Sequence, residues 1–195
     1  MTLNYTRLPI QQVRRSDRAV EDEDWIGSFL QRAPVGVLAT AYEGQPFINS
    51  NLFVYDEVAH AIYLHTASKG RTRFNVEAAA GESEMGSAAV CFHVFEMGRL
   101  LPADTALEFS VEYGGVTVFG QGRVVDDWEE ARHGLQLLLD KYFPHLRPGR
   151  DYRAIVDEEL ARTAVYRIDV EAWSGKRKAV DEDFAGAFWY SGGQE

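Results

Sequence analysis

The residues best suited to binding an anion lie in one short segment, where Lys69, Arg71 and Arg73 fall within five positions. The chain carries a formal net charge of −10, so this cluster of cations is a local exception. Thr66 precedes the cations, and Gly70 between them indicates a turn that leads into a helix. Guanidinium groups, a hydroxyl and the free amides of a helix N-terminus together suit a terminal phosphate. The alternative is an exposed basic turn, and the residue types alone favour neither interpretation.

A histidine stands directly before this segment. His65 lies in the strand-like run from Tyr63 to Thr66, where it could be an interior polar group with a satisfied hydrogen bond. Its imidazole could also deliver a proton, because histidine titrates near neutral pH. As a lone residue, His65 is better explained by interior packing.

Several other functions are disfavoured by the residues present. The negative charge argues against nucleic acid as a partner, because phosphate backbones are neutralised by many Lys and Arg residues. Gly120 and Gly122 begin like a dinucleotide fingerprint, but Val125 stands where the third glycine belongs, so we expect bulges or a close backbone approach there. The five histidines are scattered, and no metal site is predicted. Cys91 is the single cysteine, and we interpret it as a structural thiol in a buried strand.

Apolar periodicity and turn residues predict an α+β fold. An amphipathic helix is expected over residues 25–33, ended by Pro34. Trp25, Phe29 and Trp128 are assigned to the core. Antiparallel strands with a few peripheral helices favour a barrel over a doubly wound sheet. The expected strands are 36–42, 47–55, 61–66, 87–95, 107–118, 119–125 and 164–173, and the further helices are 73–80, 128–142 and 151–161.

The length of 195 residues predicts one main domain. Residues 1–20 are expected to form an N-terminal arm, 21–180 the domain, and 181–195 a C-terminal tail. No apolar run reaches the roughly 18 residues of a membrane span, and the first residues lack the pattern of a signal peptide. We therefore expect a cytoplasmic protein that does not enter a membrane.

The cationic segment resembles a motif of the pyridoxamine 5′-phosphate oxidase-like superfamily, and most closely its nitroimidazole-resistance (Nim-like) branch. That branch has the pattern His-Thr-x-x-x-Gly-Arg-x-Arg-x-Asn. The matching residues here are His65, Thr66, Gly70, Arg71, Arg73 and Asn75. Three further blocks are similar in the same order, namely 13–19, 107–120 and 173–176.

The resemblance implies an antiparallel split β-barrel that binds FMN at the interface of a homodimer. Thr66, Lys69, Gly70, Arg71 and Arg73 would hold the ribityl phosphate, and His65 would face the flavin and the substrate. The isoalloxazine ring would be lined by Ala39, Thr40, Phe47, Ile48 and Asn49, with Tyr113, Gly114, Gly115, Trp173 and Lys176 offered across the subunit interface.

The activity that this resemblance implies is an FMN-dependent reductase. Electrons would pass from a reduced nicotinamide, NAD(P)H, to a small electron-poor acceptor such as a nitroaromatic. Vitamin B6 oxidation is not expected, because Thr72 replaces the second basic residue of the oxidase pattern and residues 175–183 lack its Arg-x-His-x-Arg element. Two alternatives remain open, a flavin-binding protein without a dedicated substrate and a haem-binding or haem-degrading split barrel.

Overall fold

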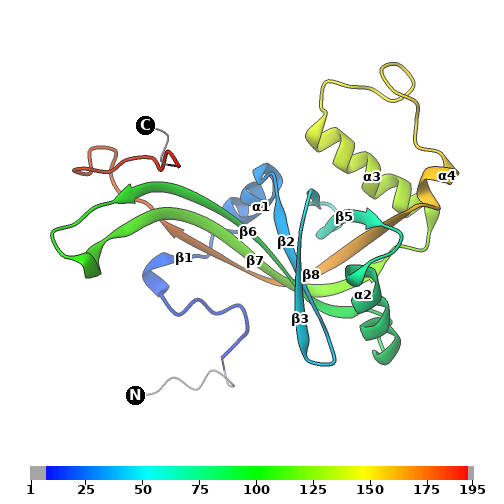
Figure 1. Ribbon diagram of the computed structural model, residues 1–195, viewed down its shortest axis with the longest axis horizontal. Helices are drawn as coiled ribbons and strands as arrows, with labels where there is room; N and C mark the ends of the chain where they lie inside the picture. Colours follow the sequence, from blue (N-terminus) through cyan, green and yellow to red (C-terminus); the bar gives the residue numbers. More distant parts are fainter. Residues whose placement is uncertain (1–7, 193–195) are drawn as a thin grey trace.

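One antiparallel sheet organises the computed structural model, which describes residues 8–192 (Figure 1). Its strands are β1 (Ala19–Val20), β2 (Gly36–Tyr42), β3 (Gln45–Asn51), β4 (Phe53–Asp56), β5 (Ala61–Ala67), β6 (Ala88–Leu101), β7 (Ser110–Val124) and β8 (Thr163–Lys178). They follow the order β3-β2-β6-β7-β8-β5-β4, and β1 pairs with β8 beside this path. The sheet curls around an apolar core, which confirms the α+β split barrel.

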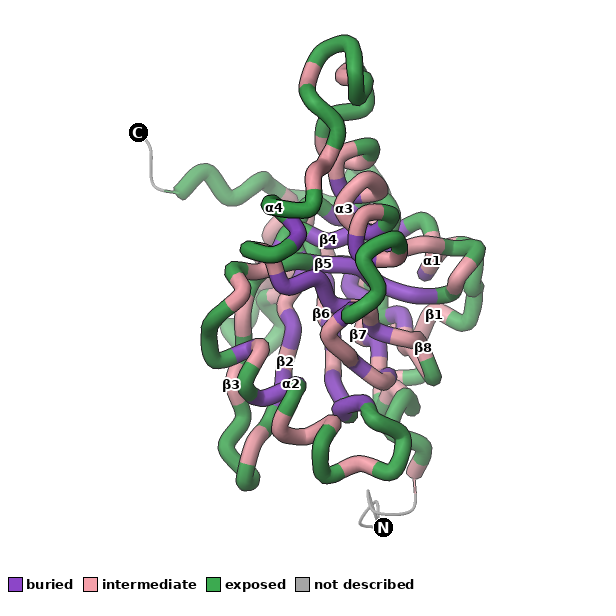
Figure 2. Tube along the Cα trace, turned by 90° about the vertical axis from the view of Figure 1, so that its right-hand side faces the viewer, coloured by how far each residue is buried: buried purple, intermediate pink, exposed green. Residues whose placement is uncertain are grey.

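Helices pack against the curled sheet at several places. They are α1 (Glu23–Arg32), α2 (Arg71–Glu82), α3 (Trp128–Tyr142) and the short α4 (Asp157–Leu160), with 3₁₀ turns at Ser16–Arg18 and Ala106–Glu108. One apolar cluster fills the barrel and includes α1 and α2 side chains, and a second lies between α3 and the sheet. Figure 2 shows the buried segments concentrated along the strands. No helix within residues 8–192 is long and apolar enough to cross a membrane.

Helix α1 lies close to the predicted range of 25–33, but it begins at Glu23 and ends at Arg32. The Asp22 side chain accepts hydrogen bonds from the amides of Asp24 and Trp25, which satisfies two donors of the first turn. Phe29 and its apolar neighbours on one face are buried in the barrel. Pro34 follows directly after the last turn, because proline cannot continue the hydrogen-bonded helix.

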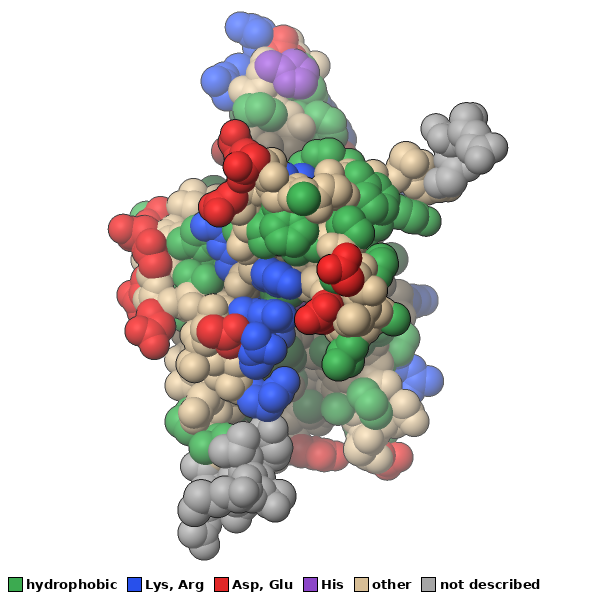
Figure 3. Space-filling view, turned by 90° about the vertical axis from the view of Figure 1, so that its left-hand side faces the viewer, with side chains coloured by type: hydrophobic (Ala, Val, Ile, Leu, Met, Phe, Trp, Pro, Cys, Tyr) green, Lys and Arg blue, Asp and Glu red, His purple; other side chains and the backbone are tan. Residues whose placement is uncertain are grey.

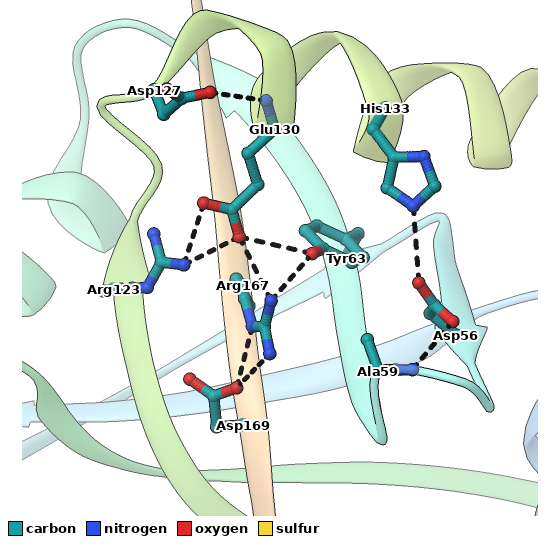
Figure 4. A network of polar contacts seen from close by, with 9 residues as sticks. All are labelled: Asp56, Ala59, Tyr63, Arg123, Asp127, Glu130, His133, Arg167 and Asp169. Carbon is teal, nitrogen blue, oxygen red and sulfur yellow. Dashed lines mark hydrogen bonds and ion pairs between the residues drawn. The ribbon is translucent and has the colours of Figure 1, made fainter.

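Helix α3 is tied to the sheet by a network of charges (Figure 4). The Glu130 carboxylate accepts hydrogen bonds from Arg123 at 2.6 and 2.8 Å and from Arg167 at 3.3 Å. The buried Tyr63 hydroxyl donates to the same carboxylate at 3.2 Å. Arg167 also pairs with Asp169 at 2.7 Å. Each charge in this network is therefore neutralised by a neighbour, which leaves none for a ligand.

The other end of α3 is fastened to α1 and β4. Lys141 Nζ donates to the Ala33 carbonyl at 2.8 Å and lies 3.9 Å from the Phe53 ring centre. Desolvation lowers the Lys141 pKa to about 8. The Tyr142 hydroxyl lies 2.8 Å from the Pro34 carbonyl and accepts a hydrogen bond from the Phe53 amide at 3.1 Å. These contacts fix the helix that borders the hollow described below.

The C-terminal tail is held against the β6–β7 hairpin, which runs out beyond the barrel in Figure 1. Arg99 Nε donates to Glu112 at 2.8 Å, and the Val180 amide donates to the same carboxylate at 2.9 Å. The hydrogen bond from Arg99 lowers the Glu112 pKa to about 2. Leu100 and Phe188 form an antiparallel bridge further along. The tail is therefore an ordered part of the hairpin up to this point.

Four of the expected elements are wrong in their boundaries. Residues 47–55 are two strands, because β3 pairs with β2 whereas β4 pairs with β5. Two strands were predicted within residues 107–125, but the structure has one long strand there, β7. Its pairing with β8 shifts register between Phe119 and Gly120. The helix expected over 151–161 is limited to α4.

Two single-residue assignments also need correction. Trp128 is 47% exposed at the start of α3 and does not belong to the core. Cys91 is half-buried and lies on the outer face of β6, although desolvation raises its pKa as expected for an unreactive thiol.

We expect Glu130→Gln to lower the free energy of unfolding by about 1–3 kcal/mol, because two arginines and a tyrosine hydroxyl lose a charged acceptor. Urea unfolding at neutral pH measures the change. The matched control is Glu129→Gln on the same helical turn, whose side chain is 85% exposed. That control should stay within about 0.5 kcal/mol of the parent protein. Equal effects of the two substitutions would contradict an anchoring role for Glu130.

Candidate functional site

The N-terminus of α2 lacks the capping groups that the other long helices have. Gly70 occupies the N-cap with φ of +152°, a region that favours glycine, and no side chain caps the helix. The first turn of α2 holds no acidic residue, whereas both α1 and α3 have an Asp cap and two acids there. The amides and the positive end of the helix dipole are thus left for an anion.

The three cations at this helix end differ in their ion pairs and hydrogen bonds. Lys69 and Arg71 are exposed, and neither forms an ion pair with any of residues 8–192. Arg73 pairs with Glu77 at 2.7 Å, and its guanidinium donates to the Ser68 carbonyl at 3.0 Å. Arg73 therefore braces the turn, and Lys69 and Arg71 are available to a ligand.

Two hydroxyl groups of the predicted site are already engaged. Thr66 Oγ1 lies 3.0 Å from the Tyr166 hydroxyl and donates to the Ala67 carbonyl at 2.9 Å. Asn75 Nδ2 donates to Thr40 Oγ1 at 3.0 Å, and both side chains are buried. Asn75 Oδ1 is the one buried side-chain acceptor among residues 8–192 that has no donor. The Asn75–Thr40 bond fixes α2 to β2 and so fixes the turn at Gly70. Sequence reasoning missed Tyr166, because only pairing of β5 with β8 brings it to Thr66.

His65 lies on the other face of β5 from Thr66, as strand alternation requires. It lines an apolar hollow of about 230 Å³ between β5 and α3, together with residues such as Leu52, Leu138 and Phe143. The His65 side chain remains partly open to solvent, but desolvation by these neighbours lowers its pKa. A neutral imidazole is therefore favoured at neutral pH.

The residues expected to line a flavin ring on β2 and β3 are divided between two faces. The register pairs Ala39 with Ile48 and Thr40 with Phe47. Ala39 and Ile48 thus share the outer face, where Ile48 is 66% exposed. Thr40, Phe47 and Asn49 lie on the face turned toward the barrel.

The residues expected from across an interface lie far from the α2 turn within one chain. Gly115 pairs with Lys176, and Thr66 pairs with Ala164. Lys176 is twelve residues beyond Ala164, which corresponds to roughly 40 Å along β8. Tyr113 and Gly114 lie beside Lys176 at this distant end. A single chain therefore does not bring the two halves of the predicted site together.

Trp173 occupies a third place, next to α1. Its ring lies 4.7 Å from the His60 ring and 5.9 Å from the Tyr55 ring, measured between centroids. Glu23 and Asp24 line the adjoining hollow of about 380 Å³. Carboxylates around Trp173 make this hollow unsuitable for a phosphate.

Comparison with known proteins supports the fold assignment. The family model described as pyridoxamine 5′-phosphate oxidase matches residues 22–177. The flavocytochrome Anf3 from Azotobacter vinelandii has a TM-score of 0.71 at 21% identity, covering 88% of this chain and 76% of that chain. The FAD and heme binding protein from Mycobacterium smegmatis has a TM-score of 0.68 at 23% identity, covering 88% and 81%.

A third solved structure bears on the Nim-like resemblance. A Bacteroides thetaiotaomicron protein, provisionally assigned to 5-nitroimidazole antibiotic resistance, has a TM-score of 0.62 at 20% identity, covering 82% of this chain and 86% of that chain. At these identities the likeness establishes the fold alone.

No curated protein sequence matches this chain significantly. Because the family model covers most of the chain, the protein belongs to the flavin-binding pyridoxamine 5′-phosphate oxidase family.

Proposed function

We propose that this protein is an FMN-dependent reductase that works as a homodimer and reduces a small electron-poor molecule such as a nitroaromatic. The observation that carries the proposal is the uncapped N-terminus of α2 beside Lys69 and Arg71. These groups form a positive site in a chain of net charge −10. When bound, FMN supplies the electron-transfer chemistry, and a reduced nicotinamide is the proposed donor.

The residues around α2 fit a ribityl phosphate. Lys69 and Arg71 can form charge-assisted hydrogen bonds to its oxygens, and the first amides of α2 can donate to the same group. Arg73 contributes indirectly, since its bond to the Ser68 carbonyl holds the turn in place. Thr66 contributes in the same way through Tyr166. FMN carries this phosphate and riboflavin does not, so the site distinguishes the two.

A second copy of the chain would complete the site. Within residues 8–192 no helix covers the outer face of β3, β2, β6 and β7, and large apolar side chains are exposed along it. These include Ile48 at 66%, Phe95 at 57% and Met97 at 45%. Exposed apolar patches of this kind are typical of subunit contacts. Tyr113 and Lys176 lie too far from Arg71 to reach the same flavin within one chain, which also supports a dimer.

His65 is the proposed proton donor or substrate contact. Its neutral imidazole stands in an apolar hollow that can hold part of a small aromatic acceptor. A group of this kind can hydrogen-bond a reacting nitro group and pass a proton to it when protonated. The surrounding leucines and Phe143 offer an apolar surface to the ring of such an acceptor.

Haem is a second candidate for the same hollow. The His65 imidazole and the apolar side chains beside it would hold haem, whose iron would supply the redox chemistry. Two of the similar structures are described as a flavocytochrome and as a FAD and heme binding protein. A Soret band in the purified protein would favour this candidate, and flavin absorbance alone would favour the reductase.

Arg71→Ala should weaken FMN binding by about 10- to 150-fold and leave riboflavin binding unchanged, because it removes a charge-assisted bond to phosphate. Fluorescence titration of flavin-free protein measures both affinities. Arg150→Ala is the matched control, since Arg150 lies on the loop after α3 with a side chain 74% exposed. Equal affinity of the parent protein for FMN and riboflavin would rule out the phosphate site.

Phe95→Glu should shift the protein from dimer to monomer and reduce its flavin content, because a charge would enter the apolar interface. Sedimentation velocity with absorbance at a flavin wavelength measures mass and cofactor together. Val58→Glu makes the same change at a fully exposed turn and should have no effect. A flavin-loaded monomer of the parent protein at micromolar concentration contradicts the proposed dimer.

His65→Ala should retain FMN but slow single-turnover reduction of a nitroimidazole by about 100- to 10,000-fold, the usual contribution of a positioned acid. The rate of the parent protein should fall as pH rises through the lowered pKa of His65, since the protonated donor is lost.

The control for this substitution is His145→Ala on an exposed loop. Retained flavin with an unchanged rate and pH profile would make His65 a structural residue. If His65→Ala instead removes a Soret band present in the parent protein, the haem candidate is favoured over the reductase.

A further inference from the structure

The apolar hollow between β5 and α3, which we call the His65 hollow, contains few polar groups. Its volume is about 230 Å³, and nine residues line it. Three of them carry a polar group, namely His65, Tyr142 and Glu159. The other six have side chains of carbon alone, and they are Leu52, Leu135, Leu138, Leu139, Phe143 and Ile155. The bonding of the three polar groups therefore decides which ligand fits.

Two of the three polar groups are already engaged within the protein. The Tyr142 hydroxyl contacts two backbone carbonyls and one backbone amide. The Glu159 carboxylate accepts hydrogen bonds from Arg153 at 2.7 Å and from the Val156 amide at 3.1 Å. By contrast, desolvation alone shifts the His65 pKa, and no hydrogen bond or charge within residues 8–192 contributes to that shift. A ligand in the hollow therefore finds its hydrogen-bonding partner at His65.

The rim of the His65 hollow carries a negative charge. The hydrogen bond from the Val156 amide lowers the Glu159 pKa, so this side chain is a carboxylate at neutral pH. Arg153 pairs with the carboxylate, but its side chain is 68% exposed and does not line the hollow. Among residues 8–192, no Lys or Arg lines the hollow. An anion that entered would meet a carboxylate and no facing cation.

The cations near this rim belong to the loop between α3 and α4, which projects from the body of the molecule. Figure 3 shows Lys and Arg side chains on this loop, at the top of the view. Arg150 on the loop is 74% exposed and pairs with Asp151 at 3.0 Å. These cations face solvent, so the hollow keeps its negative rim.

The volume and the lining of the His65 hollow suit one uncharged ring. An engineered apolar cavity of about 150 Å³ binds benzene. A hollow of about 230 Å³ therefore has room for one ring with a substituent. Transfer of an ionised group into apolar surroundings is costly unless the group is paired. An anionic ring thus binds less favourably here than an uncharged ring of the same size.

We propose that the His65 hollow selects uncharged single-ring acceptors and that Glu159 is the residue that rejects anionic ones. This inference deepens the proposed function and rests on it, because an acceptor in contact with His65 lies in this hollow. The ring packs on the leucines and Phe143, and its polar group bonds to His65. Glu159 acts by repelling a negatively charged substituent.

The test compares two compounds of similar size that differ by one charge, 4-nitrobenzamide and 4-nitrobenzoate. Equilibrium dialysis against the full-length protein measures the affinity for each compound, and no reduced nicotinamide is added, so neither compound is consumed. The parent protein should bind 4-nitrobenzamide about tenfold or more tightly than 4-nitrobenzoate. Higher salt concentration should narrow this difference, because salt screens exposed charges. Equal affinities for the two compounds would overturn the proposal.

Glu159→Gln should strengthen 4-nitrobenzoate binding about fivefold and leave 4-nitrobenzamide binding within about twofold of the parent, because only the anion is repelled. Glu158→Gln is the matched control, since it removes the same charge from the preceding residue, which is exposed and does not line the hollow. The control should change neither affinity. Equal effects of the two substitutions, or no effect of Glu159→Gln, would show that Glu159 does not select the ligand.

Two further measurements locate the compounds and keep the two proposals distinguishable. Leu139→Trp should fill the hollow and abolish binding of both compounds, in a variant that keeps the circular dichroism of the parent. Retained binding would place the compounds elsewhere and overturn the inference. Flavin absorbance is recorded on the same samples. Selective binding by a protein without flavin contradicts the reductase and keeps the selectivity, whereas a flavoprotein that reduces and binds both compounds equally keeps the reductase and overturns the selectivity.

Discussion

Strand β8 is the element on which the rest of the sheet depends, because its sixteen residues pair with β5, β7 and β1. A bulge opposite Gly120 shifts the register and changes which residues face the core. Ile168 faces inward before the bulge, and Gly175 faces inward after it. Lys176 therefore points outward, toward Tyr113. A side chain at position 120 would meet the Asp169 carbonyl at 2.0 Å, so the bulge requires glycine there.

Many arginines among residues 8–192 form ion pairs, whereas Lys69, Arg71 and Lys176 form none. Around Glu130, the carboxylate and the arginines neutralise one another and fasten α3 to the sheet. At the α2 turn, Arg73 is paired but Arg71 and Lys69 are not. At the far end of β8, Lys176 is likewise unpaired. In an acidic protein, such open cations are the natural places for anionic ligands.

The hollow beside His65 depends on the position of α3 rather than on β5 alone. Glu130 holds the first turns of α3, and Lys141 and Tyr142 hold its last turn against α1 and β4. His65 and Thr66 are neighbours in sequence, yet alternation along β5 separates them onto opposite faces. The two side chains therefore have different surroundings, with Thr66 beside Tyr166 and His65 in the apolar hollow.

Some features of this protein are decided locally and could be predicted from the sequence. The bounds of α3 at 128–142 follow from the Asp127 cap and the apolar spacing, because helix hydrogen bonds are local. The cationic segment 69–73 stands out because three cations cluster in an acidic chain. Gly120 was expected to mark a bulge, and the register shift confirms it.

Other features are decided only by pairing between distant segments. The break at Leu52 separates β3 from β4 because they pair with different strands, which no local pattern reveals. The contacts of Thr66 with Tyr166 and of Arg18 with Tyr113 join residues about a hundred positions apart. The face on which Trp173 or Lys176 lies depends on a bulge in the register with β7. Side-chain direction in a sheet reverses with every residue of register, so tertiary pairing alone determines which predicted residues meet.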